Sequence, residues 1–123
     1  MLVEILKANY QYGYPEVEGV EAMQRVAACD AAIFIVAAVD ARPCGFIKGI
    51  YDGSRAIIHL LSVHPAMQHS GIGTALVRAF RAECKARNAP TLSVTVTEQS
   101  AGFWEKQGFE RLPVFVMLED PIM

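Results

Sequence analysis

The chain has 123 residues, 53% of them hydrophobic, which suits a single domain over residues 1–123 with its own core. Eleven basic and thirteen acidic residues give a net charge of −2 without a basic run, which argues against a nucleic-acid partner. No stretch approaches the ~20 apolar residues that a membrane span needs, so no membrane partner is expected.

The cysteines argue against a fold stabilised by disulfide bonds or by zinc. Cys29, Cys44 and Cys84 are odd in number and far apart, which fits neither a disulfide framework nor a zinc site. Charged residues also interrupt the only early apolar run, so no secretion signal is expected. We therefore expect buried free thiols, no metal and a cytoplasmic location.

The N-terminal part gives weaker signals. Residues 2–6 are expected to form a short edge strand. Three tyrosines in the loop over residues 9–14 either line an acceptor pocket or pack over the core edge. Apolar residues spaced near 3.6 after Pro15 predict a helix that runs through Cys29.

Three strands are predicted next. Residues 32–39 are apolar and β-branched, and residues 44–51 pair back on them after a turn. A second turn signal precedes a third strand over residues 55–63. The sequence therefore predicts an antiparallel meander.

A glycine-rich loop follows the meander and leads straight into a helix. Gln68, Gly71 and Gly73 fit the pattern Q-x-x-G-x-G, and glycines at a helix start let a phosphate approach free N–H groups. A P-loop is excluded because no lysine follows Gly73. Two features oppose a dinucleotide-binding fingerprint. The fingerprint needs a third small residue where Leu76 stands, and it is not preceded by an antiparallel meander such as the one predicted here.

The helix after this loop ends near Asn88 and Pro90, and residues 91–96 alternate as a strand does. This strand–helix–strand unit should be right-handed, with parallel strands. A short helix is expected within residues 100–109, SAGFWEKQGF, with Gly108 just beyond its end. Residues 109–118 are expected to form the closing strand or strands.

Two separated motifs resemble those of the GNAT superfamily of N-acetyltransferases. One is L-S-V-H-P followed by Gln68-x-x-Gly71-x-Gly73, and the other is the F-W-E-K-Q-G-F run that ends at Phe109. The resemblance implies a mixed, mostly antiparallel central sheet flanked by helices (α/β, α+β), with a strand–helix–strand core that binds acetyl-CoA. The chain departs from the family with Ser100 in place of alanine, Trp104 in place of tyrosine, and a short N-terminal region.

In this family the strand before the glycine loop splays from its neighbour, and its backbone holds the pantetheine and polarises the thioester carbonyl. That role would fall to Leu61, Ser62 and Val63. The pyrophosphate would lie on the N–H groups of the loop. The loop residues carried over are Gln68, which positions the loop, and His69, Ser70, Gly71, Ile72, Gly73 and Thr74.

The proton-transfer groups are less clear from the residues. Ile57 stands where the family often has its base and cannot titrate, whereas His59 lies two residues on, on the same predicted face. His59 is either that base or a half-buried structural residue. Trp104 cannot act as the general acid, because indole does not titrate usefully, but it can donate a hydrogen bond or pack against the pantetheine.

The resemblance implies an acetyl-CoA-dependent N-acetyltransferase that moves an acetyl group to an amine by direct attack on the thioester. The alternative is a non-catalytic acyl-CoA-binding module of the same fold, since the acid position has changed. The sequence does not indicate the acceptor amine. An exposed final strand suggests a homodimer by analogy.

Overall fold

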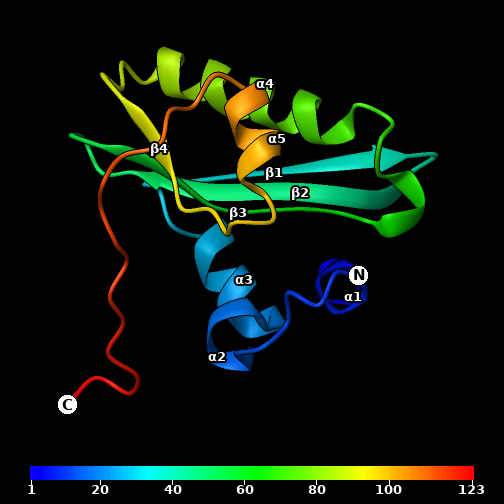
Figure 1. Cartoon of the computed structure of the whole chain (residues 1–123). Coiled ribbons are helices and arrows are strands. Elements are labelled where there is room, and N and C mark those ends of the chain that lie inside the picture. The colour runs from blue at the N-terminus through cyan, green and yellow to red at the C-terminus, as the bar shows by residue number, and fades with distance from the viewer.

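The computed structural model describes residues 1–123 and has three layers (Figure 1). A four-stranded sheet in the order β1-β2-β3-β4 lies between α4 and α5 on one face and α1, α2 and α3 on the other. None of the helices combines the length and the hydropathy that a membrane-spanning helix requires. The elements are α1 (Leu2–Ala8), α2 (Pro15–Glu18), α3 (Val20–Ala27), β1 (Ala32–Val39), β2 (Arg42–Tyr51), β3 (Ala56–Val63), η1 (Pro65–Met67), α4 (Ile72–Ala86), β4 (Leu92–Val94) and α5 (Ala101–Lys106).

The predicted meander and crossover are both present. β1 pairs with β2 and β2 pairs with β3, each antiparallel, as the β-branched runs and turn signals predicted. β4 pairs parallel to β3 after the long helix α4, so the strand–helix–strand unit is confirmed. The fold is therefore the expected mixed, mostly antiparallel sheet flanked by helices.

The N-terminal prediction was wrong in two places. Residues 2–8 form α1 instead of an edge strand, and Ile5 and Leu6 turn inward as helical neighbours. The helix predicted after Pro15 is split at Gly19, whose backbone is extended at φ −71° and ψ 171°. A Cβ on Gly19 would lie 2.4 Å from the Pro15 carbonyl oxygen, so only glycine fits this break.

The closing strand predicted over residues 109–118 is absent. β4 has only three residues, so it offers a short edge for pairing. The C-terminal segment runs away from the sheet without helix or strand, as Figure 1 shows in red. Phe115 is 93% exposed and Met117 is 92% exposed, although their apolar neighbours gave the segment its strand-like pattern.

The cysteines are free, as predicted, but only two are buried. Cys44 and Cys84 lie in the interior, whereas Cys29 is exposed in the turn between α3 and β1. Burial raises the pKa of the Cys84 thiol, because a thiolate loses its solvation inside the protein. Cys84 is therefore a packing residue of the core.

The core between α4 and the sheet depends on one close approach. Phe80 of α4 is fully buried and lies against Gly49 of β2, where a Cβ would come within 2.7 Å of the Phe80 ring. The same Cβ would lie 2.1 Å from the Ile57 carbonyl oxygen of β3. The absence of a side chain at Gly49 thus sets how closely α4 approaches the sheet.

We predict that Gly49→Ala lowers the free energy of unfolding by about 3 kcal/mol, because backbone of β3 and the Phe80 ring must both move. Gly13→Ala is the matched control, since a Cβ there meets nothing within 4 Å. Its stability should stay within about 1 kcal/mol of the wild type. Urea denaturation of both variants measures the difference, and equal stability would contradict the role given to Gly49.

Candidate active site

β3 parts from β4 halfway along its length. The two strands pair only from Ala56↔Leu92 to Ile58↔Val94. On the other side, β2 residues Lys48 and Gly49 are adjacent but pair with Leu60 and Ile58, so His59 is an extra, bulged residue of β3. A bulge bends its strand and increases the twist, and beyond it residues 60–63 have no strand on their outer edge.

The open edge exposes backbone groups of two residues. The His64 N–H donates to the Cys44 carbonyl of β2 at 2.7 Å. Because backbone groups alternate between the two edges of an antiparallel pair, those of Leu61 and Val63 point away from β2, into the gap. The strand therefore presents peptide groups there that no neighbouring strand pairs.

The glycine loop lies beside this gap and opens α4. Gly71 caps the helix in a left-handed conformation, φ 88°, and has no side chain to satisfy the first helical N–H groups. The first bond of the helix runs from the Ala75 N–H to the Gly71 carbonyl at 3.0 Å. A helix of 15 residues thus directs free N–H groups and the positive end of its dipole toward the gap.

The open edge and the glycine loop line one cavity of about 860 Å³. Every residue that the resemblance predicted to bind acetyl-CoA, except Ser70 and Ile72, lies in the wall of this cavity. The Ser70 hydroxyl instead donates to the Met67 carbonyl within the loop. The lining residues are Asn9, Tyr10, Gln11, Leu61, Ser62, Val63, Gln68, His69, Gly71, Gly73, Thr74, Thr97, Gln99, Ser100 and Phe103.

Asn9 and Gln11 are site residues that the sequence reasoning missed. Asn9 donates to the Val63 carbonyl at 2.7 Å, and Gln11 donates to the Leu61 carbonyl at 3.2 Å. Both contacts join residues at least 50 positions apart in the chain, so no local pattern pointed to them. Of the loop tyrosines only Tyr10 reaches the cavity, where it is 98% exposed.

Trp104 lies in the core and is absent from the cavity wall. It is 6% exposed and makes edge-to-face contacts with Phe103 and Phe109, with ring centroids 5.1 and 5.6 Å apart. Its neighbour Phe103 faces the cavity instead, 3.4 Å from where a Cβ on Gly73 would lie. The helix α5 therefore presents an apolar ring to the site at this point.

His59 lies at the bulge, exposed on the surface and outside the cavity wall. Partial burial of its ring lowers its pKa, and the nearby charge of Lys48 lowers it further. Lys48 is itself 7% exposed, and its pKa is lowered by burial and raised in part by Glu18. The His59 imidazole is accordingly neutral at pH 7 and able to accept a proton.

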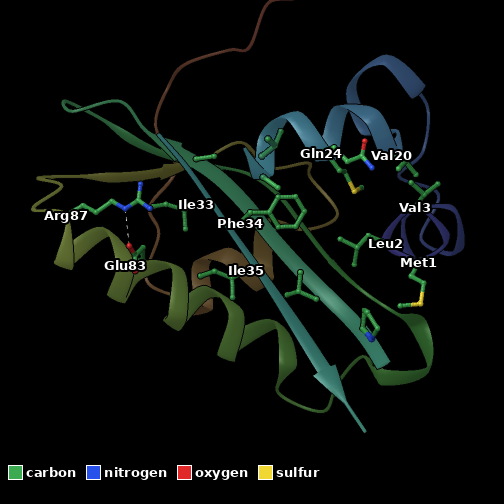
Figure 2. Close-up of a pocket in the computed structure, with 16 residues that line it drawn as sticks. Met1, Leu2, Val3, Val20, Gln24, Ile33, Phe34, Ile35, Glu83 and Arg87 are labelled. Carbon is green, nitrogen blue, oxygen red and sulfur yellow. Dashed lines mark hydrogen bonds and ion pairs between the residues drawn. The ribbon is translucent and has the colours of Figure 1, made fainter. Parts of the chain in front are cut away.

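A second cavity, of about 760 Å³, surrounds the outer edge of β1 (Figure 2). Phe34 points to one face of that strand and Ile35 to the other, and an ion pair between Arg87 and Glu83 at 3.0 Å closes one end. Most of its wall is apolar, and it holds none of the predicted site residues. The predicted site residues that line a cavity therefore all lie beside β3.

Residues 30–111 match the family model of the acetyltransferase (GNAT) domain. The chain belongs to the GNAT acetyltransferase family. This GNAT chain is 33% identical over 84 residues to an acetyltransferase of Yersinia pestis (strain Pestoides F). The matched part is 66% of this chain and spans only 60% of the Yersinia protein.

Solved GNAT-type structures share the fold. The PaiA N-acetyltransferase of Thermoplasma acidophilum, in complex with coenzyme A, superposes with a TM-score of 0.84 at 18% identity, over 92% of this chain and 84% of that one. An aminoglycoside 6′-N-acetyltransferase of Acinetobacter haemolyticus has a TM-score of 0.78 at 16% identity, over 98% of this chain and 92% of its own. At these identities the likeness concerns the architecture.

We predict that Lys48→Met raises the pKa of His59 toward its ordinary value of 6.5, because a cation that opposes ring protonation is removed. Burial of the ring persists, so the return is partial. The imidazole carbon-bound proton signals, followed by NMR across the titration, report the midpoint. Lys85→Met, on the exposed face of α4, is the control and should leave the midpoint unchanged. An unmoved midpoint in Lys48→Met would show that the two groups are not coupled.

Proposed function

We propose that this GNAT chain binds acetyl-CoA and transfers its acetyl group to an amine by direct attack on the thioester. One observation carries the proposal: the unpaired end of β3 and the free N–H groups of α4 line the same cavity. A pantetheine arm needs peptide partners along its length, and a pyrophosphate needs N–H donors and positive charge. This cavity offers both, side by side.

Each half of the donor then has its own residues. The backbone of Leu61, Ser62 and Val63 takes the pantetheine arm and polarises the thioester carbonyl. The loop from Gln68 to Thr74 takes the pyrophosphate on its N–H groups, including those of Ser70 and Ile72. Gln68 holds the loop in place, because its amide donates to the Val63 carbonyl at 3.0 Å and to the Asn9 side chain at 2.9 Å.

We assign the proton-accepting role to His59, which is neutral at pH 7 and lies on β3 two residues before Leu61. The acid limb of kcat/KM should then shift upward in Lys48→Met together with the His59 titration. Water or Ser100, which lines the cavity, protonates the departing thiolate. Trp104 contributes by packing behind Phe103, since its indole does not titrate usefully.

A non-catalytic acyl-CoA-binding module is the second candidate. It is favoured by Trp104, because the family's titratable tyrosine is replaced by a buried indole at this position. A panel of primary amines with acetyl-CoA separates the two. Release of free CoA that depends on the amine supports the transferase, whereas tight CoA binding without turnover supports the module.

We predict that acetyl-CoA and CoA, each at 100 times its dissociation constant, stabilise the chain by about 2.7 kcal/mol and that NAD does not. Gly73→Asp should abolish the shift, because it sets a carboxylate beside the pyrophosphate. The variant should still fold, since an acidic residue suits the first turn of a helix and the new Cβ meets only the Phe103 ring at 3.4 Å and the Leu61 side chain at 3.9 Å. Thermal unfolding with each ligand measures this, with Gly13→Asp as control. A native CoA shift in Gly73→Asp would remove the loop from the site.

We also propose that the chain forms a homodimer through residues 112–118 and acts in the cytoplasm. The segment exposes several large apolar side chains, and the outer edges of β1 and β4 have no partner strand. The free thiols of Cys29, Cys44 and Cys84 support a reducing compartment.

We predict that the wild type sediments at about twice its chain mass of 13.5 kDa and that Phe115→Glu with Met117→Glu sediments as a monomer. Charged residues at these exposed positions disfavour an apolar contact while leaving the core untouched. Val17→Glu, at a 57% exposed position on α2, is the control and should remain dimeric. A monomeric wild type in analytical ultracentrifugation would refute the dimer.

A further inference from the structure

The carbonyls on the open edge of β3 accept hydrogen bonds from side-chain amides. The Val63 carbonyl accepts from Asn9 Nδ2 at 2.7 Å and from Gln68 Nε2 at 3.0 Å. The Leu61 carbonyl accepts from Gln11 Nε2 at 3.2 Å. A carbonyl oxygen has two lone pairs, so the acceptor capacity of Val63 is filled by side-chain amides.

The loop between α1 and α2 is built to deliver these two amides. Ser62, which is 2% exposed, accepts from Asn9 Nδ2 at 2.9 Å and donates to Gln11 Oε1 at 2.6 Å. Tyr10, between them, has φ 57°, a left-handed conformation that is unfavourable for a bulky residue. The Tyr10 side chain is free in solvent, so the contacts of its two neighbours hold this backbone in place.

Side-chain amides and a pantetheine arm offer the same chemistry. The arm carries two secondary amides, whose N–H groups require acceptors on the strand that holds it. Given the acetyl-CoA site proposed above, we propose that the side-chain amides of Asn9 and Gln11 occupy the positions of the two pantetheine amides, and that the incoming pantetheine arm displaces them from β3. Asn9 and Gln11 are thus positioning residues that keep the strand edge satisfied until the donor arrives.

Displacement also changes the wall of the cavity. Asn9, Tyr10 and Gln11 line the cavity, and Asn9 accepts from Gln68 of the glycine loop at 2.9 Å. Once the arm takes these carbonyls, the loop around Tyr10 loses its bonds to Leu61 and Val63. The loop on this side of the cavity therefore rearranges when the donor binds.

The test compares two ligands by isothermal titration calorimetry: CoA, and 3′-phospho-ADP, which has the phosphates but no pantetheine arm. Asn9→Ala should bind CoA about 3- to 10-fold more tightly, the equivalent of one removed competing hydrogen bond, and 3′-phospho-ADP as the wild type does. Gln11→Ala should also bind CoA more tightly than the wild type, but by a smaller factor, because the hydrogen bond from Gln11 to the Leu61 carbonyl is longer. Gln24→Ala, an exposed amide on α3, is the matched control.

A second readout is amide hydrogen exchange at Gln11, whose N–H donates to the Leu6 carbonyl at 2.8 Å. This amide should exchange faster when CoA binds and stay unchanged with 3′-phospho-ADP. Unchanged or weaker CoA binding by Asn9→Ala would overturn the inference, as would equal losses for both ligands. A wild type that binds neither ligand would instead refute the proposed function.

Discussion

The site depends on a bulge in β3, where one extra residue lies between two residues that pair with adjacent positions of β2. The extra residue, His59, lets β3 pair with β2 along its whole length while leaving β4 after Ile58. In a sheet without this bulge, β3 and β4 would continue their parallel pairing, and the peptide groups of Leu61 and Val63 would form hydrogen bonds with β4. The edge that we propose binds the pantetheine is therefore an interruption in the sheet.

The interruption is useful because α4 keeps both halves of the cavity in fixed positions. Its first turn faces the cavity, while Phe80 holds its middle against Gly49. Arg81 donates to the Gln107 carbonyl at 2.8 Å, and the Gln107 amide donates to Thr74 at 3.1 Å, which joins the end of α5 to the glycine loop. The glycine loop, which we propose binds the pyrophosphate, is thus supported by rigid elements.

Local patterns predicted most of the sheet and the glycine loop, because both depend on neighbours in the chain. The strand alternation, the turn signals and the left-handed Gly108 (φ 98°) are properties of a few consecutive residues. α1 was mistaken for a strand, since its short apolar run fits either period. The segment after Phe109 has strand-forming residues without a partner long enough to order them.

The polar contacts of the site were beyond the reach of such patterns. Asn9 and Gln11 meet β3 across 50 or more positions, and only the packing of α1 on the sheet brings them there. The motif around Phe103 and Trp104 identified the family, but which of the two rings faces the cavity depends on how α5 docks on α4. Sequence spacing indicates that such residues belong to one region and does not fix their orientation.

Cys29 has a practical consequence for studying this molecule. It is the one exposed thiol of the three, and it precedes β1 at Ala32, which pairs with Ile50 at the end of the sheet opposite Val63. A maleimide dye would therefore attach at a single point, away from the cavity. The native chain can carry a fluorescent reporter for tumbling or immobilisation without an engineered cysteine.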